Sequence, residues 1–116
     1  MSKVTIYHNP QCSKCRQTLD LIREKGIEPT IVEYLKNPPT VAELTEILAL
    51  LGLPPSGLMR KQEAAYKEAG LDDASLSEDE QIAAMVAFPE VIERPIVLSN
   101  GKAAIGRPPA SVIDIL

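Results

Sequence analysis

Residues 4–16 read VTIYHNPQCSKCR and place a thiol where a short strand gives way to a helix. The β-branched and aromatic run Val4–Tyr7 predicts the strand, and the helical spacing of the apolar residues that follow predicts a helix that ends at Gly26. Cys12 therefore falls at or just before the start of this helix. Unpaired backbone N–H groups and the positive end of the helix dipole stabilise an anion there, so the position favours a thiolate over a thiol.

Three further residues near Cys12 in the sequence can add positive charge: His8, Lys14 and Arg16. A free thiol titrates at about 8.5, and a helix N-terminus, a C-x-x-C spacing and cationic neighbours all lower this pKa. We therefore interpret Cys12 as a candidate nucleophile at neutral pH.

Cys12 and Cys15 are the only cysteines of the chain, and they have the spacing C-x-x-C. A zinc site would need two more ligands from a single His and scattered carboxylates, with no second C-x-x-C, so we predict no metal site. Alternatively, both cysteines could be buried and pack as small apolar side chains without any chemical role. The position at the start of a helix favours redox or nucleophilic use instead.

Length and composition limit the classes of protein to which this chain can belong. The 116 residues suit one domain, 1–116, which can bury a core without a disulfide. There is no long apolar run, and the first residues lack the apolar region of a signal peptide, so we expect a cytoplasmic protein with reduced cysteines. The net charge of −4 and the absence of a basic run predict no nucleic-acid and no membrane partner.

Capping and turn residues divide the rest of the chain into further elements. In order, we expect a strand at 30–34, a helix from the capping box Thr40/Glu43 to Gly52, a helix at 59–69, a helix from the capping box Ser77/Glu80 to Pro89, a hairpin at 95–105 around Asn100–Gly101, and a short helix at 110–116. This order predicts a parallel first strand pair, an antiparallel hairpin and a small mixed four-stranded sheet flanked by helices. With C-x-x-C opening the first helix, we expect an α/β, thioredoxin-like fold, with its core at about 1–39 and 90–116 and a helical insertion at about 40–89.

Five short motifs run nearly end to end along the chain: IYHNPQC at 6–12, EPTIVEYL at 28–35 with NPP at 37–39, LMRK at 58–61, ERPIV at 93–97 and GRP at 106–108. In this order they resemble the glutaredoxin-coupled arsenate reductase family. The resemblance implies a thioredoxin-like fold with a helical insertion, and a thiolate that attacks arsenate to form a covalent adduct. It also implies that glutathione, as a co-substrate, and glutaredoxin, as a partner, complete the reduction to arsenite, with no bound cofactor.

By this resemblance Cys12 is the nucleophile, His8 assists its ionisation, and Arg60, Arg94 and Arg107 bind the oxyanion. The chemistry of these residues agrees, because a guanidinium stays charged and donates paired hydrogen bonds to a tetrahedral anion. Such cations also offset the repulsion between a thiolate and an anionic substrate. Phosphate and sulfate have a similar shape, so they are expected to mimic arsenate at the site.

The sequence context differs among these candidates. Arg94 and Arg107 each precede a proline in a loop, and the first of these loops is where the thioredoxin-like fold often holds a cis peptide bond facing the cysteine. Arg60 is the weakest candidate, since its neighbours are typical of a helix surface. For His8 we expect a protonated ring that tunes the thiolate by its charge, not one that transfers a proton.

Cys15 departs from the family pattern, in which a small polar residue stands at this position. It follows Cys12 by about one helical turn on the same face, which makes it a candidate resolving thiol for an internal disulfide. Two other functions remain open: a glutaredoxin-like dithiol-disulfide oxidoreductase, and a non-enzymatic thiol-stress regulator that binds RNA polymerase. Neither needs three arginines, so the arginines favour the enzyme, which we expect to be a monomer.

Overall fold

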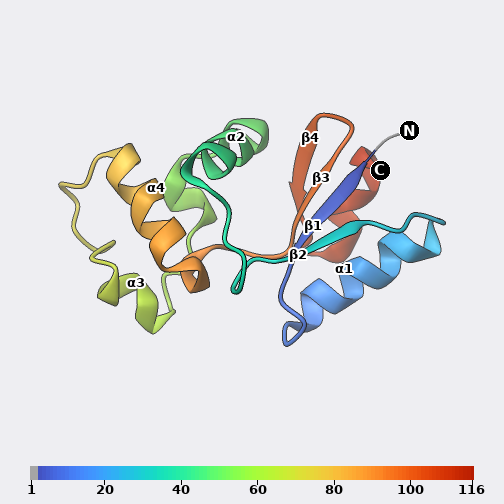
Figure 1. Ribbon diagram of the computed structural model, residues 1–116, viewed down its shortest axis with the longest axis horizontal. Coiled ribbons are helices and arrows are strands. Elements are labelled where there is room, and N and C mark those ends of the chain that lie inside the picture. Colours follow the sequence, from blue (N-terminus) through green and yellow to red (C-terminus); the bar gives the residue numbers. More distant parts are fainter. Residues whose placement is uncertain (1–2) are drawn as a thin grey trace. The chain divides into compact units, whose positions relative to one another are not determined.

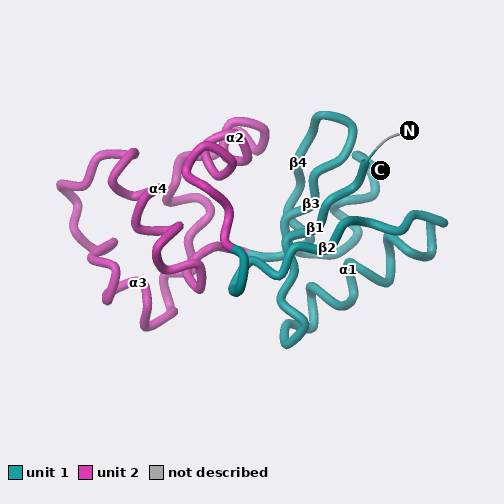
Figure 2. Tube along the Cα trace, in the orientation of Figure 1, with its two compact units in different colours: residues 1–37, 94–116 teal, residues 38–93 magenta. Residues whose placement is uncertain are grey.

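A computed structural model describes residues 3–116, and the chain divides into two compact units (Figures 1 and 2). Unit 1 contains residues 1–37 and 94–116, and unit 2 contains residues 38–93. The division expected from the sequence lies within four residues of these bounds. No helix within residues 3–116 has the length and apolarity to cross a bilayer.

Unit 1 contains a four-stranded mixed sheet and one α-helix (Figure 1). The elements are β1 (Val4–His8), α1 (Ser13–Glu24), β2 (Thr30–Glu33), β3 (Ile96–Ser99), β4 (Lys102–Ile105) and a 3₁₀ helix (Pro109–Ile115). The strand order is β2-β1-β3-β4, with β1 parallel to β2 and the other two neighbouring pairs antiparallel. This confirms the predicted sheet and its mixed character.

One face of this sheet forms the core of unit 1. Val4 and Ile6 of β1 pack with Leu19 and Ile22 of α1, and Val97 and Val112 complete the cluster. The two α1 residues are three apart, so they lie on one face of the helix. Full burial stabilises the fold by about 1.5–3 kcal/mol for each such side chain. The cluster therefore holds α1 against β1, the strand that leads into it.

The predicted hairpin of β3 and β4 depends on the two residues of its turn, Asn100 and Gly101. Asn100 and Gly101 have φ values of 54° and 71°, as a two-residue type I′ turn requires.

The final helix differs from the expectation, because 109–115 is a 3₁₀ helix and not an α-helix. Its N–H groups bond to carbonyls three residues back, which is common for short helical pieces such as this proline-led segment.

Unit 2 is helical. Its elements are α2 (Val41–Leu51), a 3₁₀ helix (Pro55–Leu58), α3 (Ala64–Glu68), α4 (Glu78–Ala87) and a second 3₁₀ helix (Pro89–Val91). Both predicted capping boxes are present, at Thr40/Glu43 and Ser77/Glu80, and α2 ends at Gly52 with a left-handed φ of 68°. α2 packs against α4, and both contribute buried apolar side chains.

The helix expected at 59–69 begins only at Ala64, so its first part was predicted wrongly. Met59 pairs with Ile92 in an isolated antiparallel bridge, and the N–H of Glu93 donates to the carbonyl of Leu58 at 2.8 Å. This pairing with a distant segment overrides local helix propensity. As a result, Arg60 follows an extended residue and does not lie on a helix surface.

Candidate active site

The loop before α1 sets the position of Cys12. The backbone N–H of Cys12 donates to the carbonyl of Asn9 at 2.9 Å, and the Asn9 side chain accepts from the N–H of Gln11 at 3.0 Å. Cys12 itself is the N-cap residue of α1, with extended backbone angles and a partly exposed side chain. The predicted location of the thiol at the start of the helix is therefore confirmed.

The surroundings of Cys12 favour its thiolate. Burial alone would raise the pKa of Cys12, but hydrogen bonding outweighs burial and lowers the pKa to about 7. The groups responsible are the backbone N–H and the thiol of Cys15, the Arg94 side chain and the backbone N–H of Lys14. Two of these are N–H groups of the first helical turn, which have no partner within a helix. The surroundings of Cys12 therefore make the thiolate accessible near neutral pH.

The register of the sheet brings two arginines to this sulfur. Ile96, the first residue of β3, lies opposite the last residue of β4 and close to the end of β1. Cys12 follows β1, Arg94 precedes β3 and Arg107 follows β4, so the three loops lie at the same end of the sheet. The two arginine loops each contain a cis peptide bond, Arg94–Pro95 and Arg107–Pro108.

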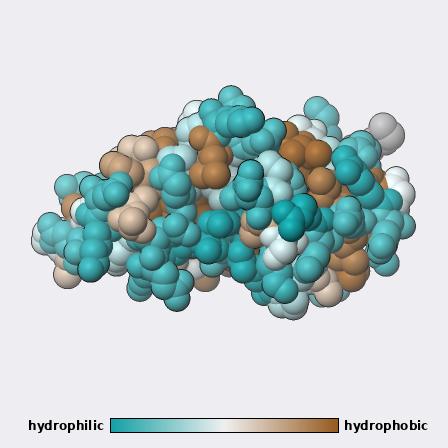
Figure 3. All heavy atoms as spheres, turned by 90° about the horizontal axis from the view of Figure 1, so that it is seen from below, coloured by the Kyte–Doolittle hydropathy of each residue, from teal (hydrophilic) through white to brown (hydrophobic). Residues whose placement is uncertain are grey.

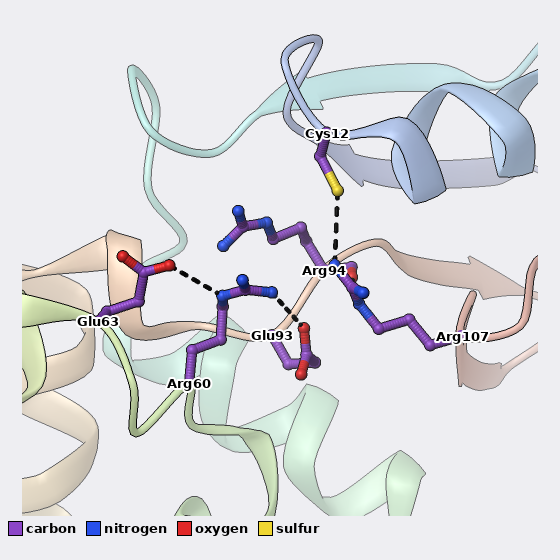
Figure 4. Close-up of polar contacts among 6 residues, drawn as sticks. All are labelled: Cys12, Arg60, Glu63, Glu93, Arg94 and Arg107. Atoms are coloured by element: carbon purple, nitrogen blue, oxygen red, sulfur yellow. Dashed lines mark hydrogen bonds and ion pairs between the residues drawn. The ribbon is translucent and has the colours of Figure 1, made fainter.

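Arg107 is held in place by two contacts (Figure 4). Its Nη2 donates to the Sγ of Cys12 at 3.5 Å, and its Nε donates to the carbonyl of Arg94 at 2.7 Å. The Arg94 side chain also bonds to Cys12. The Arg107 guanidinium is thus directed at the Cys12 sulfur, and the Arg94 side chain lies beside it, so an oxyanion bonded to this sulfur would meet positive charge from both arginines.

Gly106 lets the Arg107 loop approach α1 closely, a feature that the sequence analysis missed. Its N–H donates to the carbonyl of Pro95 at 2.9 Å, and its carbonyl accepts from Thr18 Oγ1 at 3.5 Å. A Cβ added at Gly106 would lie 2.4 Å from that Oγ1 and 2.7 Å from the Cγ of Pro95. Any larger residue would therefore displace the loop. In the sequence, the only signal of this close approach is the glycine directly before Arg107.

Cys15 lies in the same helical turn but behaves differently from Cys12. Its side chain is fully buried, and its thiol donates to the sulfur of Cys12. Burial, together with the charge of Cys12, raises the pKa of Cys15 to about 12. Near pH 7 Cys12 can therefore form a thiolate, whereas Cys15 stays a neutral thiol.

His8 does not match the expected protonated ring. It is the last residue of β1, only 6% exposed, and its Nδ1 has no hydrogen-bond partner in the described part of the chain. Burial lowers the pKa of His8, although Glu33 on the neighbouring strand partly opposes this effect. The ring is therefore neutral at pH 7, and tuning of Cys12 by a histidine charge is not supported. The sequence could not show this, because it does not show that β1 ends in the interior.

A pocket of about 200 Å³ lies beside the Cys12 loop. It is lined by His8, by residues 9–11 of the loop, and by Glu33, Leu35 and Lys36. The Lys36 ammonium lies 3.6 Å from the Glu33 carboxylate, so the rim carries both signs of charge. The pocket gives a small polar molecule room beside the loop that precedes Cys12.

Arg60 belongs to unit 2, where two carboxylates pair with it (Figure 4). Its Nε lies 3.2 Å from Glu63 Oε1, and its Nη1 lies 3.0 Å from Glu93 Oε1. Burial acts to lower the pKa of Arg60, but the two carboxylates outweigh it and raise the pKa. The structure thus brings together Cys12, Cys15, Arg94 and Arg107 in unit 1, whereas the role of Arg60 in oxyanion binding stays a prediction.

The site can perform nucleophilic chemistry on an anion or exchange with a disulfide. Within residues 3–116 there is no group of three His, Cys, Asp or Glu side chains arranged to hold a metal ion. The mixed sheet, with a cysteine at the start of its first helix, defines a thioredoxin-like fold.

The chain belongs to the ArsC family, whose family model matches residues 7–115. It is 45% identical over 117 residues to a Neisseria meningitidis protein named arsenate reductase, with each chain fully covered. It is also 52% identical to Escherichia coli YfgD, a protein of uncharacterised function, over 98% of this chain and 97% of that protein. The solved structure of an arsenate reductase from Vibrio cholerae matches with a TM-score of 0.94 and 49% identity, covering 98% of each chain. These matches confirm the family resemblance drawn from the motifs.

The pKa of Cys12 predicts how its reactivity depends on pH. Because only the thiolate reacts, alkylation by iodoacetamide should increase with pH and reach half of its maximal rate near pH 7. The buried Cys15 should stay unmodified in the folded protein over the same range. Mass spectrometry of alkylated peptides measures both rates. A Cys12 profile like that of a free thiol would contradict the proposed effect of its neighbours.

We expect Gly106→Ala to lower the free energy of unfolding by about 1–3 kcal/mol, since overpacking displaces neighbouring atoms. It should also raise the pKa of Cys12, because Arg107 follows directly in the displaced loop. Urea denaturation and the alkylation profile measure the two effects. Gly57→Ala is the control, because its Cβ would meet the flexible Leu53 side chain at 3.2 Å. Equal effects of both substitutions would argue against the close approach.

Proposed function

We propose that this protein reduces arsenate to arsenite, with Cys12 as the nucleophile and with glutathione and glutaredoxin supplying the electrons. The observation that carries the proposal is the Cys12 thiolate, with a pKa of about 7, in contact with the guanidinium groups of Arg94 and Arg107. The relatives named arsenate reductase support it. Glutathione and glutaredoxin enter through the family resemblance alone.

The first step is attack of the Cys12 sulfur on arsenic. A bond forms between sulfur and arsenic, and one arsenate oxygen leaves as water after protonation. Thiolate and arsenate repel each other because both are anions, so the step needs positive charge at the point of attack. Arg94 and Arg107 supply this charge through planar donor groups that stay protonated at neutral pH.

The second step transfers two electrons. Arsenic passes from As(V) to As(III) when two thiol sulfurs are oxidised to one disulfide, and glutathione provides thiols for this exchange. Glutaredoxin then reduces the resulting disulfide. This chemistry needs thiols that are kept reduced, which places the reaction in the cytoplasm.

Selectivity for arsenate would arise from chemistry more than from binding. Phosphate and sulfate have the same tetrahedral shape, and guanidinium groups bind them in the same way. Thiols do not reduce phosphate at ordinary potentials. Phosphate and sulfate should therefore bind at the site as mimics without turnover.

A second candidate function is that of a dithiol-disulfide oxidoreductase, which the contact between the thiol of Cys15 and the sulfur of Cys12 favours. Such an enzyme would not need two arginines beside the nucleophile. The same arginines count against a regulator that only binds RNA polymerase. The comparison of arsenate reduction with disulfide exchange therefore separates the candidates.

The direct test is arsenate-dependent turnover with glutathione and glutaredoxin, compared with turnover driven by thioredoxin. We expect turnover with the glutaredoxin system and its complete loss in Cys12→Ser, because serine cannot form the sulfur–arsenic adduct. Arsenite is measured directly, and circular dichroism checks that the variant is folded. Residual arsenite production by Cys12→Ser would exclude Cys12 as the nucleophile.

Arginine replacements test the oxyanion site. Lysine keeps the charge but loses the planar paired donors, so Arg94→Lys and Arg107→Lys should each lower arsenate turnover by about 10²-fold or more. Exchange with hydroxyethyl disulfide should change much less. Arg23→Lys is the matched control, because Arg23 pairs with Glu28 on the surface near the other end of α1.

We expect Arg60→Lys to give a milder or similar loss of turnover. If both activities fell equally in the Arg94 and Arg107 variants, the two residues would have a structural role. If neither activity fell, no oxyanion site would exist at these arginines.

A further inference from the structure

We propose that Cys15 is the resolving thiol: once arsenic is bonded to Cys12, the Cys15 sulfur attacks the Cys12 sulfur, releases arsenite and leaves a Cys12–Cys15 disulfide. This inference rests on the proposed function, because it needs the Cys12 adduct. It gives Cys15 the place that the proposed function gives to glutathione in the two-electron step, and it leaves glutathione and glutaredoxin to reduce the disulfide after arsenite has left.

The geometry of α1 permits this disulfide. Cys12 is the N-cap of α1 and Cys15 lies in its first turn. Residues three apart on a helix have Cα atoms about 5 Å apart. Disulfides join Cα atoms that are roughly 4.4–6.8 Å apart. The Cys15 thiol already donates a hydrogen bond to the Cys12 sulfur, so the two sulfurs that would bond are in contact.

Burial restricts what Cys15 can react with. Its side chain has no exposed surface, whereas that of Cys12 is partly exposed. A thiol in solution therefore reaches Cys12 and not Cys15. The arginines approach Cys12 from the loops beside β3 and β4, while Cys15 approaches it from α1. The oxyanion and the resolving sulfur thus reach the nucleophile from different elements.

The contact between the two sulfurs also explains why Cys12 reacts with arsenic before Cys15 reacts with Cys12. While Cys12 is a thiolate, burial, the charge of Cys12 and the hydrogen bond to it keep the proton on Cys15. Bonding of arsenic moves the negative charge from the Cys12 sulfur onto the arsenate oxygens, which the arginines pair with, and weakens the sulfur as an acceptor, whereas the positive charge of Arg94 remains and favours ionisation of Cys15. Cys15 therefore becomes a nucleophile only after the first step.

The step balances in atoms and electrons. A sulfur–sulfur bond forms between Cys15 and Cys12 as the sulfur–arsenic bond breaks. The electron pair of the broken bond leaves with arsenic, which becomes As(III), and the two sulfurs are oxidised together. The proton of Cys15 goes to an oxygen of the departing arsenite. No oxidant other than arsenate is needed.

The experiment is a single turnover without any added thiol. Fully reduced protein is mixed with arsenate, and arsenite, free thiols and intact mass are measured. The wild-type chain should release arsenite in a stoichiometric amount and lose two hydrogen atoms, and after denaturation neither cysteine should be open to alkylation. Cys15→Ser should release only background arsenite under these conditions and should recover turnover with glutathione and glutaredoxin.

Cys15→Ala is the matched control for the hydrogen bond. Serine can still donate to the Cys12 thiolate and alanine cannot, but neither forms a disulfide, so both should fail in the thiol-free experiment. The inference is overturned if the wild-type chain releases arsenite only when glutathione is added, or if Cys15→Ser releases a stoichiometric amount without it. Absence of arsenite under every condition would instead overturn the proposed function, and this inference with it.

Discussion

The site depends on one constraint, which is the packing of α1 against β1. Leu19 and Ile22 pack against Val4 and Ile6, and this buried cluster holds the helix against the strand that leads into it. The N–H groups of the first turn are therefore already placed at the Cys12 sulfur before the thiolate forms. A loosely packed helix would supply the same groups without fixing their direction.

Charge at the site is a local property that opposes the charge of the whole chain. The net charge of −4 repels an anionic substrate, yet the sheet topology places two guanidinium groups beside the thiolate. Because β3 and β4 form a hairpin, residues just before β3 and just after β4 must lie side by side. Gly106 then allows close contact with α1. Two residues thirteen positions apart thus act on one sulfur because of strand register.

Local signals in the sequence predicted most of the fold. The capping boxes, the Asn100–Gly101 turn and the thiol at the start of a helix each depend on a few neighbouring residues, and the structure confirms them. The failures involve distant contacts. Residues 59–63 are not helical because Met59 pairs with Ile92. His8 is buried by the fold, and the contact of Thr18 with Gly106 joins segments far apart in the sequence.

The two cysteines show how position assigns chemistry to identical side chains. Cys12 precedes the helix, where N–H groups and guanidinium donors reach its sulfur, and its pKa falls to about 7. Cys15 lies three residues later, where burial dominates, and its pKa rises to about 12. Each cysteine contributes to the difference, since the Cys15 thiol stabilises the Cys12 thiolate and the Cys12 charge keeps Cys15 protonated. In the mechanism that we propose, a covalent bond at the Cys12 sulfur would end both effects, because the sulfur would no longer carry the charge that keeps the proton on Cys15.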